Sequence, residues 1–301
     1  MREPEAQRLA RLHVPGGGPV RLLRVGSGLA SGTYRAERDG ASYSLRVTDV
    51  AARGGSFDAH WEHAVCELAG AARIGPEVMR ADPAAGVLVC RWVEGRAWQG
   101  AAAAQPRKLA AIAALMRAIH ALPQPHPARA RSPADWIAHY ERAIGSRPPI
   151  LTQEPATLRT AAARRLETVA GFGRVAPALC HSDLHALNVV ETDAGLVALD
   201  WEYAHVADPF WDPAGWSCAN DFSAAQRRDL LRRYLQRAPS AEELARFAAL
   251  VWLYDYVCLL WSEIYLREDA GASIRAARQR AARIEARLRA ASGPTAGLAA
   301  N

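Results

Sequence analysis

Residues 181–203 read HSDLHALNVVETDAGLVALDWEY and carry the most informative pattern in the chain. Two apolar segments flank the turn-forming residues Thr192 to Gly195, and this arrangement predicts a β-hairpin. Asp183 then lies on a tight loop before the first strand, Asn188 enters that strand, and Asp200 leaves the second strand. The hairpin is therefore expected to bring the side chains of Asn188 and Asp200 together.

The residue types in this hairpin favour a site for a hard cation. Amide and carboxylate oxygens, as on Asn188 and Asp200, suit Mg²⁺, which keeps waters and shares phosphate oxygens with a substrate. Asp183 is expected to face a hydroxyl group. Any one of these residues alone is typical of a turn, but the full set between apolar strands predicts a functional site.

The charge composition narrows the chemistry. The chain has 301 residues, a formal net charge of +6 and 37 basic residues, of which one is lysine, Lys108, and 36 are arginine. Because arginine does not replace lysine as a Schiff-base or general-base residue, those enzyme classes are excluded unless Lys108 serves. A GxxxxGK[ST] phosphate loop is absent from the sequence as well. Any phosphate-binding cation is therefore expected to be an arginine.

The remaining composition predicts a cytoplasmic globular protein. The five cysteines are dispersed without a CxxC pair, which is typical of reduced core thiols. The N-terminal residues lack an apolar signal segment, so no secretory signal is expected. The apolar run Phe247–Trp261 is shorter than a membrane span and contains Asp255, so we expect a buried helix and no membrane partner.

Hydrophobic periodicity predicts a β-rich segment followed by a helical one. The first part is expected to contain five strands and one helix: strands 20–25, 33–38, 42–47, 77–81 and 87–92, and helix 57–73. The strands 33–38 and 42–47 flank Asp39-Gly40, a strong hairpin signal. The second part is expected to contain six helices: 105–122, 133–145, 156–171, 223–236, 241–267 and 271–291. The predicted fold class is α+β.

Two segments, the HxDxxxxN pattern of 181–188 and LDWEYAHVADPFWDPA of 199–214, resemble the aminoglycoside phosphotransferase/choline kinase family. The second segment is most similar to the choline, ethanolamine and thiamine kinase branch. The resemblance implies a two-lobed, protein-kinase-like fold. It implies a nucleotide-binding lobe in 1–93, a hinge in 94–98, and a helical lobe in 99–301 that carries the catalytic hairpin 178–203.

The resemblance also implies an activity: transfer of the γ-phosphate of ATP to a hydroxyl of a small, amine-bearing metabolite. Asp183 would orient that hydroxyl and accept its proton, while Asn188 and Asp200 would hold Mg²⁺ over the phosphates. Three further residues are expected to support the catalytic loop: His181, Asp208 and Asp212.

The family resemblance places the nucleotide on the first lobe. Arg46 stands where the family has its phosphate-holding cation. Glu62 is expected to be its carboxylate partner, and Glu67, five residues later, is the alternative. The loop GSGLASGTY resembles the family's phosphate loop, with Ala30 where a polar residue is usual. The remaining residues expected to contact the nucleotide are Gly28, Ser31 and Gly32 in this loop, and Val89, Arg91 and Val93 beside the adenine.

Aromatic and acidic residues near the C-terminal end are the candidates for the acceptor site. Aromatic rings together with carboxylates can bind an ammonium group by cation–π attraction and charge. An alternative is that the same aromatics form the core of the helical lobe. The candidate substrate residues are Glu202, Asp255, Tyr256 and Trp261.

Three other functions remain open from the sequence. An aminoglycoside-type kinase would need a broad acidic acceptor site, and a nucleotide-binding relative without catalysis would not need every catalytic position. A nucleic-acid binder is suggested by the six arginines between 275 and 289, but a solvated helix face is the expected explanation of that pattern. We expect no nucleic-acid partner, and either a monomer or a homodimer.

Overall fold

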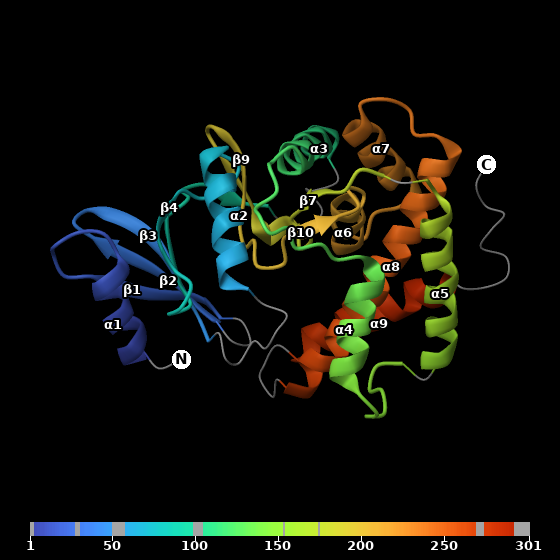
Figure 1. Ribbon diagram of the computed structural model, residues 1–301, viewed down its shortest axis with the longest axis horizontal. Helices are drawn as coiled ribbons and strands as arrows, with labels where there is room; N and C mark the ends of the chain where they lie inside the picture. The colour runs from blue at the N-terminus through green and yellow to red at the C-terminus, as the bar shows by residue number, and fades with distance from the viewer. Residues whose placement is uncertain are drawn as a thin grey trace. The chain divides into compact units, whose positions relative to one another are not determined.

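The computed structural model describes residues 3–27, 31–49, 58–98, 105–152, 154–173, 175–268 and 274–291. The chain divides into two compact units (Figure 1). Unit 1 comprises residues 1–129 and 178–206, and unit 2 comprises residues 130–177 and 207–301. Unit 1 holds the β-sheet and unit 2 is helical, so the predicted α+β class is confirmed. The hinge at 94–98 stays a prediction.

The main sheet of unit 1 is antiparallel, with the strand order β1-β2-β3-β5-β4. Its strands are β1 (Arg21–Ser27), β2 (Ser31–Arg38), β3 (Ala41–Thr48), β4 (Val78–Asp82) and β5 (Val87–Arg91). Asp39 and Gly40 join β2 to β3 with φ angles of 51° and 77°, as the hairpin prediction requires.

Helix α1 (Glu3–His13), which the sequence analysis did not predict, covers one face of this sheet (Figure 1). Ala6, Leu9 and Ala10 are buried at helical spacing against apolar strand residues that include Leu45 and Val47 of β3. Side chains alternate between the two faces along a strand. Arg46, which lies between Leu45 and Val47, therefore points to the opposite face of the sheet.

Helix α2 (Ala59–Ala71) begins at Asp58, whose carboxylate accepts the backbone N–H groups of His60 and Trp61. This cap satisfies two of the N–H groups that a helix leaves without an internal partner. Trp61 and Val65 bury one side of the helix. Glu62 lies on α2 as well and is 1% exposed, which makes it one of the most buried charged residues described.

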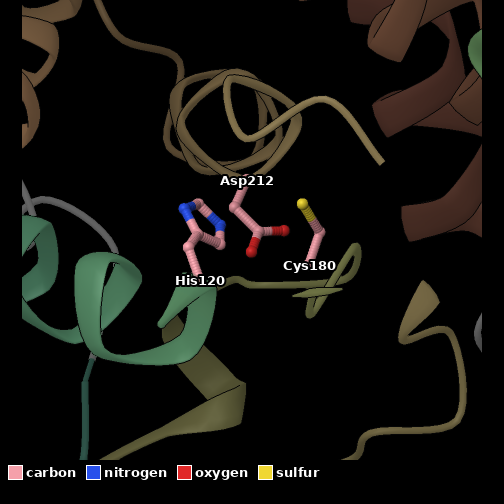
Figure 2. Close-up of side chains that lie close together, drawn as sticks. All are labelled: His120, Cys180 and Asp212. Atoms are coloured by element: carbon pink, nitrogen blue, oxygen red, sulfur yellow. The ribbon is translucent and has the colours of Figure 1, made fainter. Parts of the chain in front are cut away.

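The rest of unit 1 carries the predicted hairpin. Its elements are β6 (Arg96–Ala97), α3 (Pro106–His120), β7 (Ala178–Cys180), the 3-10 helix η3 (Ala186–Asn188), β8 (Val189–Thr192) and β9 (Gly195–Ala198), followed by β10 (His205–Ala207). Strands β6, β8 and β9 form a second sheet, and β7 pairs with β10. Figure 2 shows two side chains of this unit, His120 at the end of α3 and Cys180 at the end of β7.

Unit 2 is built around one long helix, α8 (Ala241–Glu268). Four helices pack on it (Figure 1): α4 (Pro133–Ile144), α5 (Pro155–Gly171), α6 (Trp211–Ala219) and α9 (Ile274–Ala290). Helix α7 (Ala224–Leu235) packs on α6. A window within α8 is apolar enough to span a membrane, but 67% of it is buried, as in a core helix.

His63 of α2 makes stability depend on pH. Burial, reinforced by the nearby charge of Arg46, lowers its pKa to about 4. Between that value and the unfolded pKa of about 6.5, the unfolded chain binds a proton that the folded chain does not. We therefore expect stability to fall as the pH drops from 6.5 towards 4. Urea denaturation at pH 5 and pH 7.5 measures this, and His63→Leu should make the dependence shallower; an unchanged slope in the variant would contradict the assignment.

Candidate active site

Arg46 of β3 joins three carboxylates in unit 1. Its Nη2 pairs with Glu62, and its Nη1 lies 2.9 Å from Asp200 Oδ1 and 3.5 Å from Glu202 Oε2. Glu67, the alternative partner, is exposed on α2. Burial alone would lower the pKa of the Arg46 guanidinium, but the attraction of Glu62 and Asp200 holds it well above its usual range. Arg46 is therefore a permanent cation at this position.

The fork of the guanidinium suits this arrangement, because its two terminal nitrogens reach different carboxylates at once. Oxygens of Glu62, Asp200 and Glu202 lie within 4.8 Å of one another. Three carboxylates beside one guanidinium carry a formal charge of −3 + 1 = −2, when all are ionised. Such an excess of negative charge at a partly buried site favours the binding of a further cation.

His181 anchors the loop that carries Asp183. The ring is fully buried, and Nε2 lies 2.9 Å from the carbonyl oxygen of Leu199, just before Asp200. Nδ1 accepts the backbone N–H of Asp183 at 3.4 Å, so Nε2 must be the nitrogen that carries the proton. The ring also packs on Trp201, with centroids 4.7 Å apart. A neutral His181 ring with a hydrogen bond at each nitrogen fits the predicted role of supporting the catalytic loop.

The side-chain amide of Asn188 is hydrogen-bonded to Asp183, so each residue fixes the orientation of the other. Its amide nitrogen donates to the Asp183 carbonyl oxygen at 3.0 Å and lies 3.4 Å from Asp183 Oδ2. The amide oxygen does not take part in these contacts and is the atom that would bind a cation. On the neighbouring strand, Leu199 N–H donates to the Asn188 carbonyl at 2.8 Å, which fixes Asn188 next to Asp200. One amide oxygen and a carboxylate are donors that fit a hard divalent ion.

The backbone has a left-handed φ angle at two positions, one just before Asp183 and one at Asp200. Ser182, just before Asp183, has φ 69°, and Asp200 has φ 63°. Non-glycine residues in this left-handed region carry strain that the surrounding structure must hold in place. Ser182 Oγ lies 2.9 Å from His205 Nδ1, with both residues buried, and this contact holds the strained position. The loop presents the side chain of Asp183, which is 34% exposed.

Several of the predicted nucleotide-contacting residues lie on strands of the main sheet. Gly28 is outside the described residues, while Ser31 and Gly32 begin β2. Val89 and Arg91 belong to β5, and the Arg91 N–H already donates to the Glu77 carbonyl at 2.8 Å. Val93 follows that strand. The roles of these residues toward a nucleotide stay predictions.

Lys108 lies away from the Arg46 cluster within unit 1. Its Nζ is 3.6 Å from Glu191 Oε2 and 4.4 Å from the ring centroid of Trp98. The only lysine of the chain is thus engaged elsewhere, and Arg46 is the cation beside the predicted metal ligand Asp200.

Two of the predicted substrate residues of unit 2 are buried, and a role of these residues in substrate binding stays a prediction. Asp255 is 4% exposed, and both of its carboxylate oxygens accept from Arg287 of α9, at 2.9 and 2.6 Å. Tyr256 is 3% exposed and stacks on Trp252. Burial is the main reason why the pKa of the Tyr256 hydroxyl is raised above its usual value. Trp261 is partly exposed and stacks on Tyr265 at 4.9 Å.

A structural role for Asp255 has a measurable consequence. Removing Arg287 leaves a buried carboxylate without its cation, which costs about 3–5 kcal/mol for buried pairs. We expect Arg287→Ala to lower the free energy of unfolding strongly, and the pair Arg287→Leu with Asp255→Leu to recover part of it. Chemical denaturation measures both. If Arg287→Ala were as stable as the wild type, Asp255 would be free to bind an amine.

Two predicted supports of the catalytic loop belong to unit 2. Asp208 accepts the Phe210 N–H at 2.9 Å and pairs with Arg246 of α8, whose Nε lies 2.8 Å away. Asp212 is 1% exposed in the first turn of α6. Asp208 thus joins the start of α6 to α8, and the support of the catalytic loop by both residues stays a prediction.

Glu202 is the residue whose position the sequence analysis did not anticipate. It was expected to meet a substrate amine, and the structure places its carboxylate on Arg46. The spacing in Asp200-Trp201-Glu202 was the available signal. Asp200 adopts a left-handed φ, and the Trp201 side chain is only 1% exposed. With Trp201 turned into the core, Asp200 and Glu202 both approach the guanidinium of Arg46.

The chain is similar to a known protein family and to several solved structures. The model of the Phosphotransferase enzyme family matches residues 21–250. No curated protein sequence matches the chain. A choline/ethanolamine kinase family protein from Mesorhizobium loti is 25% identical, with a TM-score of 0.75 over 98% of this chain and 97% of that one.

Two further solved structures share the fold. Choline kinase LicA from Streptococcus pneumoniae is 22% identical, with a TM-score of 0.73 over 95% of this chain and 98% of that one. Amicoumacin kinase hAmiN, in complex with AMP-PNP, Ca²⁺ and Ami, is 14% identical, with a TM-score of 0.68 over 95% and 94%. These matches confirm the kinase-like fold and the resemblance drawn from residues 181–214. The chain belongs to the Phosphotransferase enzyme family.

Proposed function

We propose that this phosphotransferase moves the γ-phosphoryl group of ATP, bound with Mg²⁺, to a hydroxyl of a small amine-bearing metabolite. The observation that carries the proposal is the arrangement within unit 1: Asp183 and Asn188 on one loop, and Arg46 and Glu62 beside Asp200. This is the set of groups that phosphoryl transfer needs: a proton acceptor, ligands for a metal ion, and a fixed cation for the phosphates.

Asp183 performs the proton transfer in this proposal. Its carboxylate holds the acceptor hydroxyl by a hydrogen bond and takes the proton as the oxygen forms a bond to the γ-phosphorus. The bond between that phosphorus and the bridging oxygen of ADP breaks in the same displacement. Asn188 fixes the Asp183 carboxylate during this step, through its amide nitrogen.

Arg46 and Glu62 perform the charge stabilisation. Glu62, which is 1% exposed, holds the guanidinium in place. Arg46 then supplies fixed positive charge to the phosphate oxygens without reorganising at the moment of transfer. A bound Mg²⁺ would be held by Asn188 and Asp200 and would neutralise charge on the phosphates. Another protein of the same fold, the amicoumacin kinase, is known with AMP-PNP and Ca²⁺.

The acceptor class rests on similarity. The solved structure at 25% identity belongs to the choline/ethanolamine kinase family. This similarity supports an amino alcohol or a related hydroxylated amine.

A screen of acceptors tests this function. Purified protein with Mg²⁺ and ATP is assayed for ADP release with choline, ethanolamine, thiamine, amino sugars and aminoglycosides, and ³¹P NMR identifies the product. We expect phosphorylation of a small hydroxylated amine. Phosphorylation of aminoglycosides alone would favour the antibiotic-kinase alternative. Nucleotide binding without turnover on any acceptor would favour a non-catalytic relative.

A further inference from the structure

The first turn of α2 is fastened to the segment that follows Asp200. The indole N–H of Trp61 donates to the carbonyl oxygen of Ala204 at 2.7 Å, and the Trp61 side chain is buried. These two residues are 143 positions apart in the sequence, so the bond is purely tertiary. Trp61 directly precedes Glu62, the residue that pairs with Arg46.

A second connection starts at the cap of the same helix. Asp58 accepts the N–H groups of His60 and Trp61 at 3.0 and 3.2 Å. Its other oxygen lies 3.3 Å from Arg129 Nη1. The carbonyl oxygen of Arg129 in turn accepts the Val206 N–H at 2.7 Å. The start of α2 is thus tied to residues 204 and 206 by two separate routes.

The other end of α2 is tied to the hairpin before Asp200. The Ala198 N–H donates to the carbonyl oxygen of Ile74 at 2.8 Å, just after the helix ends. Gly75 is packed closely between Ala69 of α2 and Trp201. A Cβ added at Gly75 would stand 2.6 Å from the Cβ of Ala69 and 3.3 Å from Trp201 Nε1. Both ends of α2 are therefore connected to backbone that flanks Asp200.

We infer that Trp61 is a positioning residue that holds α2 in register with the hairpin, so that the Arg46–Glu62 pair is assembled before any nucleotide binds. Glu62 can direct Arg46 only if α2 stays at one distance from β3 and Asp200. The Trp61 hydrogen bond sets that distance one residue away from Glu62.

Trp61→Phe tests the inference, because phenylalanine keeps most of the buried ring and loses the N–H donor. Trp252→Phe is the matched control: Trp252 is 4% exposed and donates its indole N–H to the Leu288 carbonyl at 3.2 Å, within unit 2. Asp58→Asn, which keeps a capping side chain and weakens the Arg129 pair, is a second variant if Trp61→Phe does not fold.

Two readouts are measured on the full-length protein. Hydrogen exchange of the α2 amides is expected to rise about fivefold to tenfold in Trp61→Phe, as loss of one buried hydrogen bond implies. The kcat/KM for ATP is expected to fall about tenfold or more, because misplacing a phosphate-binding cation is costly, while the KM for the acceptor stays constant. Trp252→Phe should change neither readout.

The outcomes separate this inference from the proposed function, on which the kinetic readout rests. Unchanged α2 exchange in Trp61→Phe would overturn the inference. Faster exchange with an unchanged kcat/KM for ATP would also overturn it, because α2 would then be held for stability alone. If the wild type showed no turnover at all, the proposed function would fail, and the exchange data would still decide whether Trp61 holds α2.

Discussion

Asp183→Asn is expected to lower kcat by about 10²–10⁴-fold, the range in which a positioned general base contributes to catalysis. Asparagine has nearly the same shape as aspartate but cannot accept a proton from the acceptor hydroxyl. The Asn188 amide would still donate to the backbone carbonyl of residue 183, so the loop should keep its conformation. The KM for ATP should stay close to the wild-type value. Initial rates of ADP release with saturating acceptor measure the effect.

The control for this variant is another carboxylate in the same hairpin. Asp193 is exposed in the turn between β8 and β9, and Asp193→Asn removes the same charge at a place without catalytic geometry. We expect this control to keep wild-type turnover. If Asp183→Asn also kept more than a small fraction of the wild-type kcat, Asp183 would not be the proton acceptor.

Arg46→Ala is expected to have the second large effect, on both turnover and stability. Turnover should be lost because no other side chain in the described cluster carries positive charge to the phosphates. Stability should fall as well, because Glu62 is 1% exposed and would be left without its cation. Breaking a buried pair in this way costs about 3–5 kcal/mol.

A second substitution separates the two effects of Arg46→Ala. Adding Glu62→Gln removes the uncompensated charge, so the double variant should regain much of the stability while remaining inactive. Thermal denaturation and ADP release are measured on the same samples. Lys108→Ala serves as the control, since Lys108 contacts Glu191 and Trp98 away from the cluster. An active Arg46→Ala protein would show that another group holds the phosphates.

The hairpin could be predicted from sequence because its signals are local. The turn at Thr192–Gly195 lies between two apolar segments, and the spacing from Asn188 to Asp200 follows directly from strand pairing. The structure pairs Thr192 with Gly195 and Val189 with Ala198, as a tight hairpin requires. The Asp39-Gly40 turn was predictable for the same reason, because two adjacent residues with positive φ specify that geometry.

Helices α1 and α6 were not predictable from the same signals. The α1 sequence is mostly polar, and its narrow apolar stripe, Ala6, Leu9 and Ala10, is stable as a helix only when packed on the sheet. In α6, Gly215 opposes helix formation locally, whereas Pro213 is tolerated because it lies in the first turn. Gly215 is required there because an added Cβ would stand 2.7 Å from the ring of Tyr254 on α8. Tertiary packing outweighs intrinsic propensity in both helices.

The ion pairs explain where the site prediction was incomplete. The pattern of acidic and aromatic residues on α8 matches an amine-binding cage as well as it matches a helix core. Only the approach of Arg287 from α9 distinguishes the two, and it lies 32 residues beyond Asp255. Likewise, the contact between Arg46 and Glu202 spans 156 residues and follows from the turn at Asp200. The pair of Asp255 and Arg287 has no local signal in the sequence, and the contact of Arg46 with Glu202 has only the spacing of Asp200 and Glu202.

The most direct test of the central claim is a single coupled assay. ADP release is measured with Mg²⁺, ATP and a hydroxylated amine, for the wild type and for Asp183→Asn, and each sample is first checked for folding. We expect acceptor-dependent ADP release by the wild type and its loss in Asp183→Asn. A folded wild-type protein that neither binds ATP nor releases ADP with any acceptor would rule out a kinase function.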